Sequence, residues 1–363
     1  MPVRYSHIRA FVGAALLVSA QNVDADSVPD GPRNHPMSFT SWPLAFAVDI
    51  TSAVNAVRLT LQPSECTPVL YHSTSFRGIT GIIDTHALWA TCVEDLEDKA
   101  EIQHGTDMIE AEIQKTGFTE ANAIPEQILR FVPQFLTERR SWTFVACFRG
   151  TLEPPNLAEP AAAKKCAEWV GGHPYSLEFE TLSDCEPRLR LGMHAELQYH
   201  RVVYDPALQR DAIARAITAV VDSAQKYCGG TLEGAWADSS AKSHARIAAQ
   251  CLIDMISGFK SAGYSWEDEW RIVCRPRIMP AGSAPDLEDA NFRPYIKTGN
   301  SRYVDLRVYE RGPVFSAFPP CVLPFRAVQV SDPSNSLFVE RQRIRRMLDE
   351  NRRLDIPIRV STG

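Results

Sequence analysis

The stretch from Trp266 to Cys274 constrains the fold more than any other part of the sequence. Successive side chains of a β-strand point to opposite faces of the sheet, so a strand here would have two different faces. The apolar face would carry Trp266, Trp270, Ile272 and Cys274, and the other face would carry Glu267, Glu269, Arg271 and Val273. The pattern predicts a strand inside a sheet, with its apolar face in the core. Because charged side chains are seldom fully buried unless they are paired, we expect the charged face to be either an ion-paired surface or a cleft that holds a catalytic carboxylate.

Composition places the chain among ordinary globular proteins. It has 363 residues, of which 45% are hydrophobic and 23% charged, a length that suits one large domain or two moderate ones. The formal net charge of −6 argues against binding of nucleic acid over the whole surface. A local basic run at 341–346 is interpreted as the solvated face of a helix.

The cysteines and the N-terminus point to different compartments. Nine cysteines are scattered without a C-x-x-C pair or zinc-ligand spacing, which predicts no metal site and favours reduced thiols in a cytoplasmic protein. Arg4 and Arg9 precede the apolar run 10–20, which resembles a signal peptide and leaves export as the alternative. A start codon placed too far upstream, or an apolar cytoplasmic extension, would give the same pattern. No other segment is long and apolar enough to span a bilayer.

The order of expected elements predicts an α+β fold, with a mixed central sheet and flanking amphipathic helices. Residues 1–42 are interpreted as an apolar segment and a flexible linker, 43–66 as a helical lead-in and 67–363 as a single α+β domain. Strands are expected at 69–72, 87–91, 143–148, 175–180, 200–204, 266–274, 322–330 and 356–360. Helices are expected at 98–115, 207–227, 241–260 and 338–351, with a short one after Ser75.

Two places at the starts of helices could carry binding groups. His72 lies where a strand turns into a helix, whose first N–H groups attract anions, and Thr74 and Ser75 add hydroxyl donors. His72 would either bind a ribose or phosphate or only cap local backbone groups. Asp98 and Glu101 are spaced for a capping-box variant, and the alternative is a polar rim on the same cleft as His72.

Several short motifs follow one another in an order that resembles a known family. They are Leu70-Tyr71-His72-x-Thr74-Ser75, Leu88-Trp89-Ala90-Thr91, Leu96-x-Asp98-x-x-Glu101 and Glu267-x-Glu269-Trp270-Arg271. The order is similar to that of the mainly bacterial family called domain of unknown function 2971, over roughly residues 68–363. The chain departs from the family pattern at Glu97, at Arg149 and in a contracted segment after Trp169.

A more distant similarity, to ADP-ribosyltransferases, implies an activity. In those enzymes an early histidine holds a ribose of NAD, and a late glutamate stabilises the oxocarbenium-like transition state. The resemblance implies an NAD-consuming transferase or glycohydrolase, with NAD as substrate and His72 and Glu269 as catalytic residues. The substrate-binding residues it implies are Tyr71, Thr74, Ser75, Asp98, Glu101, Glu267 and Arg271.

The alternative is a non-catalytic, nucleotide- or peptide-binding regulatory protein in phage defence or the stress response. Geometry separates the two hypotheses, because the enzyme needs His72 and the Glu267/Glu269 face to line one pocket.

Overall fold

The computed structural model describes residues 42–63, 67, 69–96, 98, 100–116, 123–152, 160–180, 195–228, 235–276, 295–296, 301–306, 323, 325–331, 337–351, 353 and 355–360. The predictions for the signal-like segment and the linker lie, up to residue 41, outside the described residues.

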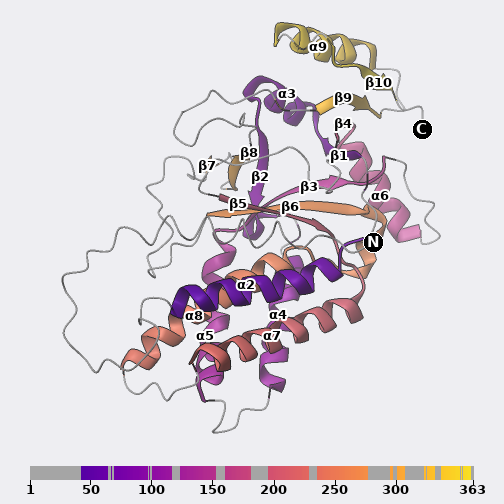
Figure 1. Cartoon of the computed structure of the whole chain (residues 1–363). Helices are drawn as coiled ribbons and strands as arrows, with labels where there is room; N and C mark the ends of the chain where they lie inside the picture. Colours follow the sequence, from indigo (N-terminus) through magenta and orange to yellow (C-terminus); the bar gives the residue numbers. More distant parts are fainter. Residues whose placement is uncertain are drawn as a thin grey trace, which may run out of the picture.

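The described residues form a mixed sheet with helices on both of its faces, which confirms the α+β class (Figure 1). The α-helices are α2 (Trp42–Thr60), α3 (Phe76–Thr85), α4 (Ala100–Lys115), α5 (Ala123–Arg140), α6 (Pro160–Gly172), α7 (Pro206–Cys228), α8 (Ala235–Ile256) and α9 (Leu337–Glu350). The strands are β1 (Val69–Thr74), β2 (Leu88–Cys92), β3 (Phe144–Arg149), β4 (Tyr175–Glu180), β5 (Ala195–Arg201), β6 (Glu269–Pro276), β7 (Tyr295–Ile296), β8 (Arg302–Leu306), β9 (Phe325–Val330) and β10 (Ile358–Val360). Two short 3-10 helices are η2 (Val93–Asp95) and η4 (Ala262–Glu267).

The sheet is arranged around β3. Its main path runs β10-β9-β4-β1-β3-β2-β8-β7, and β6 pairs with β3 on one side and with β5 on the other. Every named pairing is antiparallel except that of β10 with β9. The strand at 269–276 is therefore an inner strand, as the alternation of its side chains predicts.

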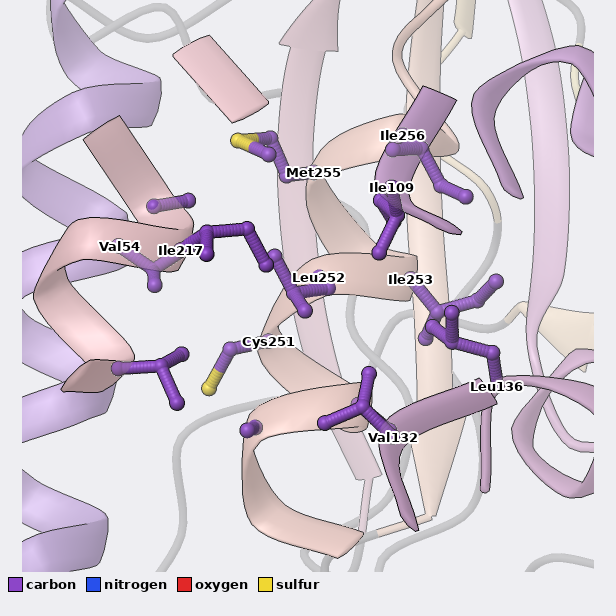
Figure 2. Packing of buried hydrophobic residues seen from close by; sticks show 14 of the residues in the cluster. Val54, Ile109, Val132, Leu136, Ile217, Cys251, Leu252, Ile253, Met255 and Ile256 are labelled. Atoms are coloured by element: carbon purple, nitrogen blue, oxygen red, sulfur yellow. The ribbon is translucent and has the colours of Figure 1, made fainter. Parts of the chain in front are cut away.

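One face of the sheet is covered by a layer of five helices, α2, α4, α5, α7 and α8 (Figure 1). Figure 2 shows α8 in the middle of this layer, where Leu252 and Ile253 meet apolar side chains of the neighbouring helices. Val145 of β3 and Val273 of β6 join the cluster from the sheet. We call this side of the sheet the helical face.

Helix α2 belongs to this layer. Phe46, Ile50 and Val54 recur every four residues, one helical turn apart, and all three are buried against α7 and α8. The segment expected to be a helical lead-in thus contributes to the core, and the packed structure begins ahead of Thr67.

The other face of the sheet packs against α3 and α9, and we call it the α3/α9 face. Ile79, Ile82 and Ile83 of α3 are buried there, as their helical spacing predicts. Ile272 of β6 and Ile344 of α9 join the same cluster. The sheet therefore separates two apolar cores.

The predicted start of the strand at 266 is corrected. Trp266 and Glu267 lie in η4 and not in the strand, because Asp268 adopts a left-handed conformation with φ of 42° and turns the chain into β6. Helix α5 has no counterpart among the predicted elements. It contains Pro133, a residue that usually ends a helix because it lacks the N–H donor.

Candidate functional site

The two sides of β6 separate as the sequence predicts. Trp270, Ile272 and Cys274 are buried in the α3/α9 core, and Glu269 and Arg271 point to the helical face. However, Glu269 and Arg271 do not line an open cleft, because each is only 4% exposed. The charged face of this strand is an ion-paired interior.

Five charged side chains meet there. Lys260, in the loop after α8, has its Nζ 2.8 Å from Glu101 Oε1 of α4 and 3.2 Å from Glu269 Oε2. The same ammonium donates a hydrogen bond to Glu267 Oε2, at the end of η4. We call the group the carboxylate network, and its members are Glu101, Lys260, Glu267, Glu269 and Arg271.

Arg271 makes most of the directional contacts in the network. Its Nε and Nη2 atoms donate to the two oxygens of Glu269 at 2.9 and 3.0 Å, a bidentate pair. Nη2 also donates to Glu101 Oε2 at 2.6 Å, and Nη1 donates to the carbonyl oxygen of Ser257 at 3.0 Å. A single guanidinium thus joins β6, α4 and the end of α8.

The surroundings shift the pKa values of two glutamates in opposite directions. Burial by itself raises the pKa of Glu269, but Arg271 and Lys260 outweigh it and lower that pKa to about 2. Burial also raises the pKa of Glu267. Lys260 lowers this pKa, but the negative charges of Glu269 and Glu101 raise it further, and the result is a pKa of about 7. Glu269 therefore stays ionised at neutral pH, whereas Glu267 titrates near neutrality.

Cys147 and Tyr204 border the network. Cys147 of β3 is paired with Arg271 of β6. Burial, and to a lesser extent the negative charge of Glu269, raise the pKa of the Cys147 thiol well above its ordinary value. A thiol held protonated is a poor nucleophile. The hydroxyl oxygen of Tyr204 accepts a hydrogen bond from the Glu269 backbone N–H at 3.0 Å.

His72 does not join Glu269, and the expectation that the two line one pocket is wrong. In β1, His72 is paired with Leu177 of β4, a member of the α3/α9 core, and its ring lies 5.6 Å from that of Phe148. Paired residues of neighbouring strands point to the same face, so His72 lies on the opposite side of the sheet from Glu269.

His72 has a structural environment. Its Nδ1 lies 2.9 Å from the carbonyl oxygen of Cys147. Burial, with His173 contributing, lowers the pKa of His72 to about 4, although its contact with Cys147 acts in the opposite sense. The ring is therefore neutral at physiological pH. It contacts the backbone of β3, whereas the local-capping interpretation expected backbone groups close to His72 in the sequence.

The remaining predicted site residues are divided between the two faces. Tyr71 shares the helical face with Glu269, because it is paired with Arg149, which is paired with Glu269. Thr74 faces the other way, opposite the buried Tyr175. Ser75 caps α3, where its side chain accepts from the Gly78 N–H at 3.2 Å.

Asp98 and Glu101 form only half of the predicted capping box. Asp98 Oδ1 accepts a hydrogen bond from the Ala100 N–H at 3.0 Å at the start of α4. The Glu101 carboxylate does not turn back toward Asp98, because it is bound by Lys260 and Arg271. The structure thus joins Glu101 with Glu267, Glu269 and Arg271, and leaves Asp98 outside the group.

Lys260 is a member of the network that the sequence patterns did not predict. It falls at the end of the helix expected at 241–260, but α8 ends at Ile256 and Lys260 lies in the irregular segment that follows. Its main chain is fixed by Val203, whose carbonyl oxygen accepts from the Lys260 N–H at 3.2 Å, and by Gln209, which donates to its carbonyl oxygen at 2.9 Å. A lysine close in sequence to a Glu-x-Glu pair is a weak signal, and the contact becomes visible only in the fold.

An open groove of about 550 Å³ lies elsewhere, between α9 and β10. Its lining combines three arginines and a glutamine with two acidic residues and one aliphatic side chain, namely Arg341, Gln342, Arg345, Arg346, Asp349, Glu350 and Ile358. Arg345 is part of the scaffold, because its Nη atoms donate to the carbonyl oxygens of Ile356 and Arg353 at 2.9 and 3.0 Å.

Comparison with protein-family models, with curated proteins and with solved structures finds no match. The resemblance to domain of unknown function 2971 therefore stays a prediction.

Within the described part of the chain, no His, Cys, Asp or Glu side chains gather in a group of three or more that could hold a metal ion. In the carboxylate network, the charges of the three glutamates are met by Lys260 and Arg271. No helix of the described residues has the length and apolar character needed to cross a membrane.

Proposed function

We propose that this protein is a non-catalytic binding protein, whose groove between α9 and β10 takes an acidic peptide segment. One observation carries the non-catalytic part: Glu269 is 4% exposed, and both of its oxygens are bound by cations inside the fold. A carboxylate that stabilises a developing positive charge has to reach the reacting atom. Glu269 instead holds helices to the sheet, and His72 lies on the opposite face.

The groove supplies the chemistry for binding. Arg341 and Arg346 are exposed on α9, whereas Arg345 and Asp349 neutralise each other at 2.9 Å. Two guanidinium groups are thus left to face a partner, against the single carboxylate of Glu350. Arginine clusters recognise acidic motifs through charge-assisted hydrogen bonds, and about 550 Å³ is within the usual range for a binding site.

The binding part is tested with a fluorescent oligoglutamate peptide and an oligolysine peptide of the same length. We expect the wild-type protein to bind oligoglutamate, more weakly as salt is added, and not oligolysine. The double variant Arg341→Glu/Arg346→Glu should lose this binding. Arg210→Glu, a charge reversal at an exposed site on α7, is the matched control and should keep it. Equal binding by the double variant and by the control would refute the groove as the site.

The non-catalytic part is tested separately, by incubating the purified protein with NAD and measuring nicotinamide. The similarity to ADP-ribosyltransferases implies that nicotinamide is released, whereas the burial of Glu269 implies that it is not. We expect none, with or without a cell extract as a source of acceptors. Release by the wild-type protein that is lost in Glu269→Gln would overturn the proposal in favour of an NAD-consuming enzyme.

A further inference from the structure

Arg139, in the last turn of α5, is a buried cation whose charge is not matched by an adjacent anion. The residue is 1% exposed, and its Nε and Nη2 atoms are buried without a hydrogen-bond partner. Among the described residues, no carboxylate forms an ion pair with this guanidinium. An uncompensated charge in the interior is strongly unfavourable, so an unsatisfied group of this kind calls for an explanation.

The unsatisfied atoms define the missing partner. Nε and Nη2 form one edge of the guanidinium, and Arg271 uses the same edge to hold both oxygens of Glu269 at 2.9 and 3.0 Å. That edge matches two oxygens of one carboxylate or phosphate group. Arg139 therefore presents a bidentate oxyanion-binding edge with no oxyanion of the described residues on it.

Two further arginines lie near Arg139. Arg246 of α8 and Arg275 of β6 lie close enough to Arg139 to help burial lower its pKa to about 10. Two carboxylates, Glu138 and Asp254, oppose the three arginines.

Both carboxylates have other partners. Asp254 is engaged by Arg275 at 2.7 Å and by Gln250 at 3.0 Å, and Gln198 donates to it at 3.2 Å. Glu138 lies 3.7 Å from Arg246. Neither carboxylate is within ion-pair distance of Arg139, so no carboxylate of the described residues is paired with its guanidinium.

We propose that a phosphate group binds at Arg139, with Arg246 and Arg275 completing the site. Arg246 marks the approach from solvent, because its side chain is 25% exposed while those of Arg139 and Arg275 are almost fully buried. Its guanidinium lies over the ring of Phe135, 4.7 Å from the centroid, which limits how far it can move. The phosphate would come either from the free ion or from the terminal phosphate of a small nucleotide. It lies on the helical face of the sheet and is independent of the α9–β10 groove.

The test uses the full chain and inorganic phosphate, with sodium chloride added to match ionic strength. Calorimetric titration measures binding, and thermal unfolding measures the stabilisation that binding causes. The main variant is Arg139→Met, which removes the charge and keeps a long side chain. The matched control is Arg130→Met on the same helix, where the arginine is 70% exposed and paired with Glu126.

We expect phosphate to bind and raise the melting temperature of the wild-type protein and of Arg130→Met, but not of Arg139→Met. Without phosphate, Arg139→Met should melt at or above the wild-type temperature, because it removes an unmatched buried charge. Arg246→Gln should fold normally and weaken phosphate binding by roughly tenfold, the loss of one charge-assisted contact.

Adenosine monophosphate distinguishes the sources of the phosphate. Tighter binding of the nucleotide than of phosphate would assign the site to a nucleotide, and equal or weaker binding would assign it to the free ion. No binding of either ligand by the wild-type protein, or the same binding by Arg139→Met, would overturn the proposal. A loss of binding in Arg130→Met equal to that in Arg139→Met would do the same.

Discussion

Replacing Arg271 by methionine tests whether the carboxylate network holds the two layers together. The substitution removes two bonds to Glu269, one to Glu101 and one to the Ser257 carbonyl oxygen, at 2.6 to 3.0 Å. It leaves Lys260 as the only cation among three glutamates. Removing one partner of a buried ion pair costs about 3–5 kcal/mol, because the remaining charge stays buried and uncompensated. That is a large fraction of the 5–15 kcal/mol that typically stabilises a domain.

The free energy of unfolding is measured by urea denaturation followed by circular dichroism. Arg201→Met is the matched control, because Arg201 lies on the neighbouring strand β5 and pairs with Asp268 at 3.0 Å at the surface, with its side chain 48% exposed. The control should lose no more than about 1 kcal/mol. Adding Glu269→Gln to Arg271→Met should cost less than the sum of the two single changes, by about 0.5–3 kcal/mol. If Arg271→Met loses no more stability than Arg201→Met, the network does not join the layers as argued.

Three further predictions concern stability. Glu267 has a pKa of about 7 in the folded protein, above its ordinary value of 4.5. Its contribution to stability is therefore full below pH 4.5 and is lost as the pH rises through 7, so the free energy of unfolding of the wild-type protein should fall by on the order of 3 kcal/mol over that range. Glu267→Gln should remove this pH dependence. Gly105→Ala would bring a Cβ to 2.7 Å from the Ile256 Cβ and should cost about 1–3 kcal/mol in urea denaturation, so a neutral result would contradict this packing of α4 on α8. Ser75→Ala removes the cap of α3 and should lower the free energy of unfolding by about 1 kcal/mol in the same assay. Ser75→Asp can still cap the helix, so an equal loss in that variant would show that the Ser75 hydroxyl does not act as a cap.

The carboxylate network accounts for Glu269 and Arg271 of β6 by ion pairing inside the fold. Glu101 comes from α4, Lys260 from the loop after α8 and Glu269 from β6, so the contacts join segments far apart in the sequence. A buried ionic group of this kind fixes the orientation of its elements, since any other packing would leave charges unpaired. This is the physical basis for proposing a binding protein over an enzyme.

Sequence patterns were sufficient for β6 and α3, where the evidence is local. Alternation of apolar and charged side chains identified β6 as an inner strand, and the spacing of Ile79, Ile82 and Ile83 identified the buried face of α3. Both patterns depend on the geometry of a single element, which the order of residues fixes. Helix α5 was not predicted, because Pro133 interrupts the signal that a helix normally gives.

The site depended on relations between elements, and these were decided by the tertiary structure. Alternation shows that Tyr71 and His72 point to opposite faces of β1, but not which of them shares a face with Glu269. That choice follows from the pairing of Tyr71 with Arg149 and of Arg149 with Glu269. A shift of one residue in either pairing would exchange the faces, and no local pattern records the register between distant strands. The sequence by itself thus determined which residues of β6 are charged and which are apolar. The fold decided that the charged residues are buried as well, and that they meet Lys260 and Glu101 instead of His72.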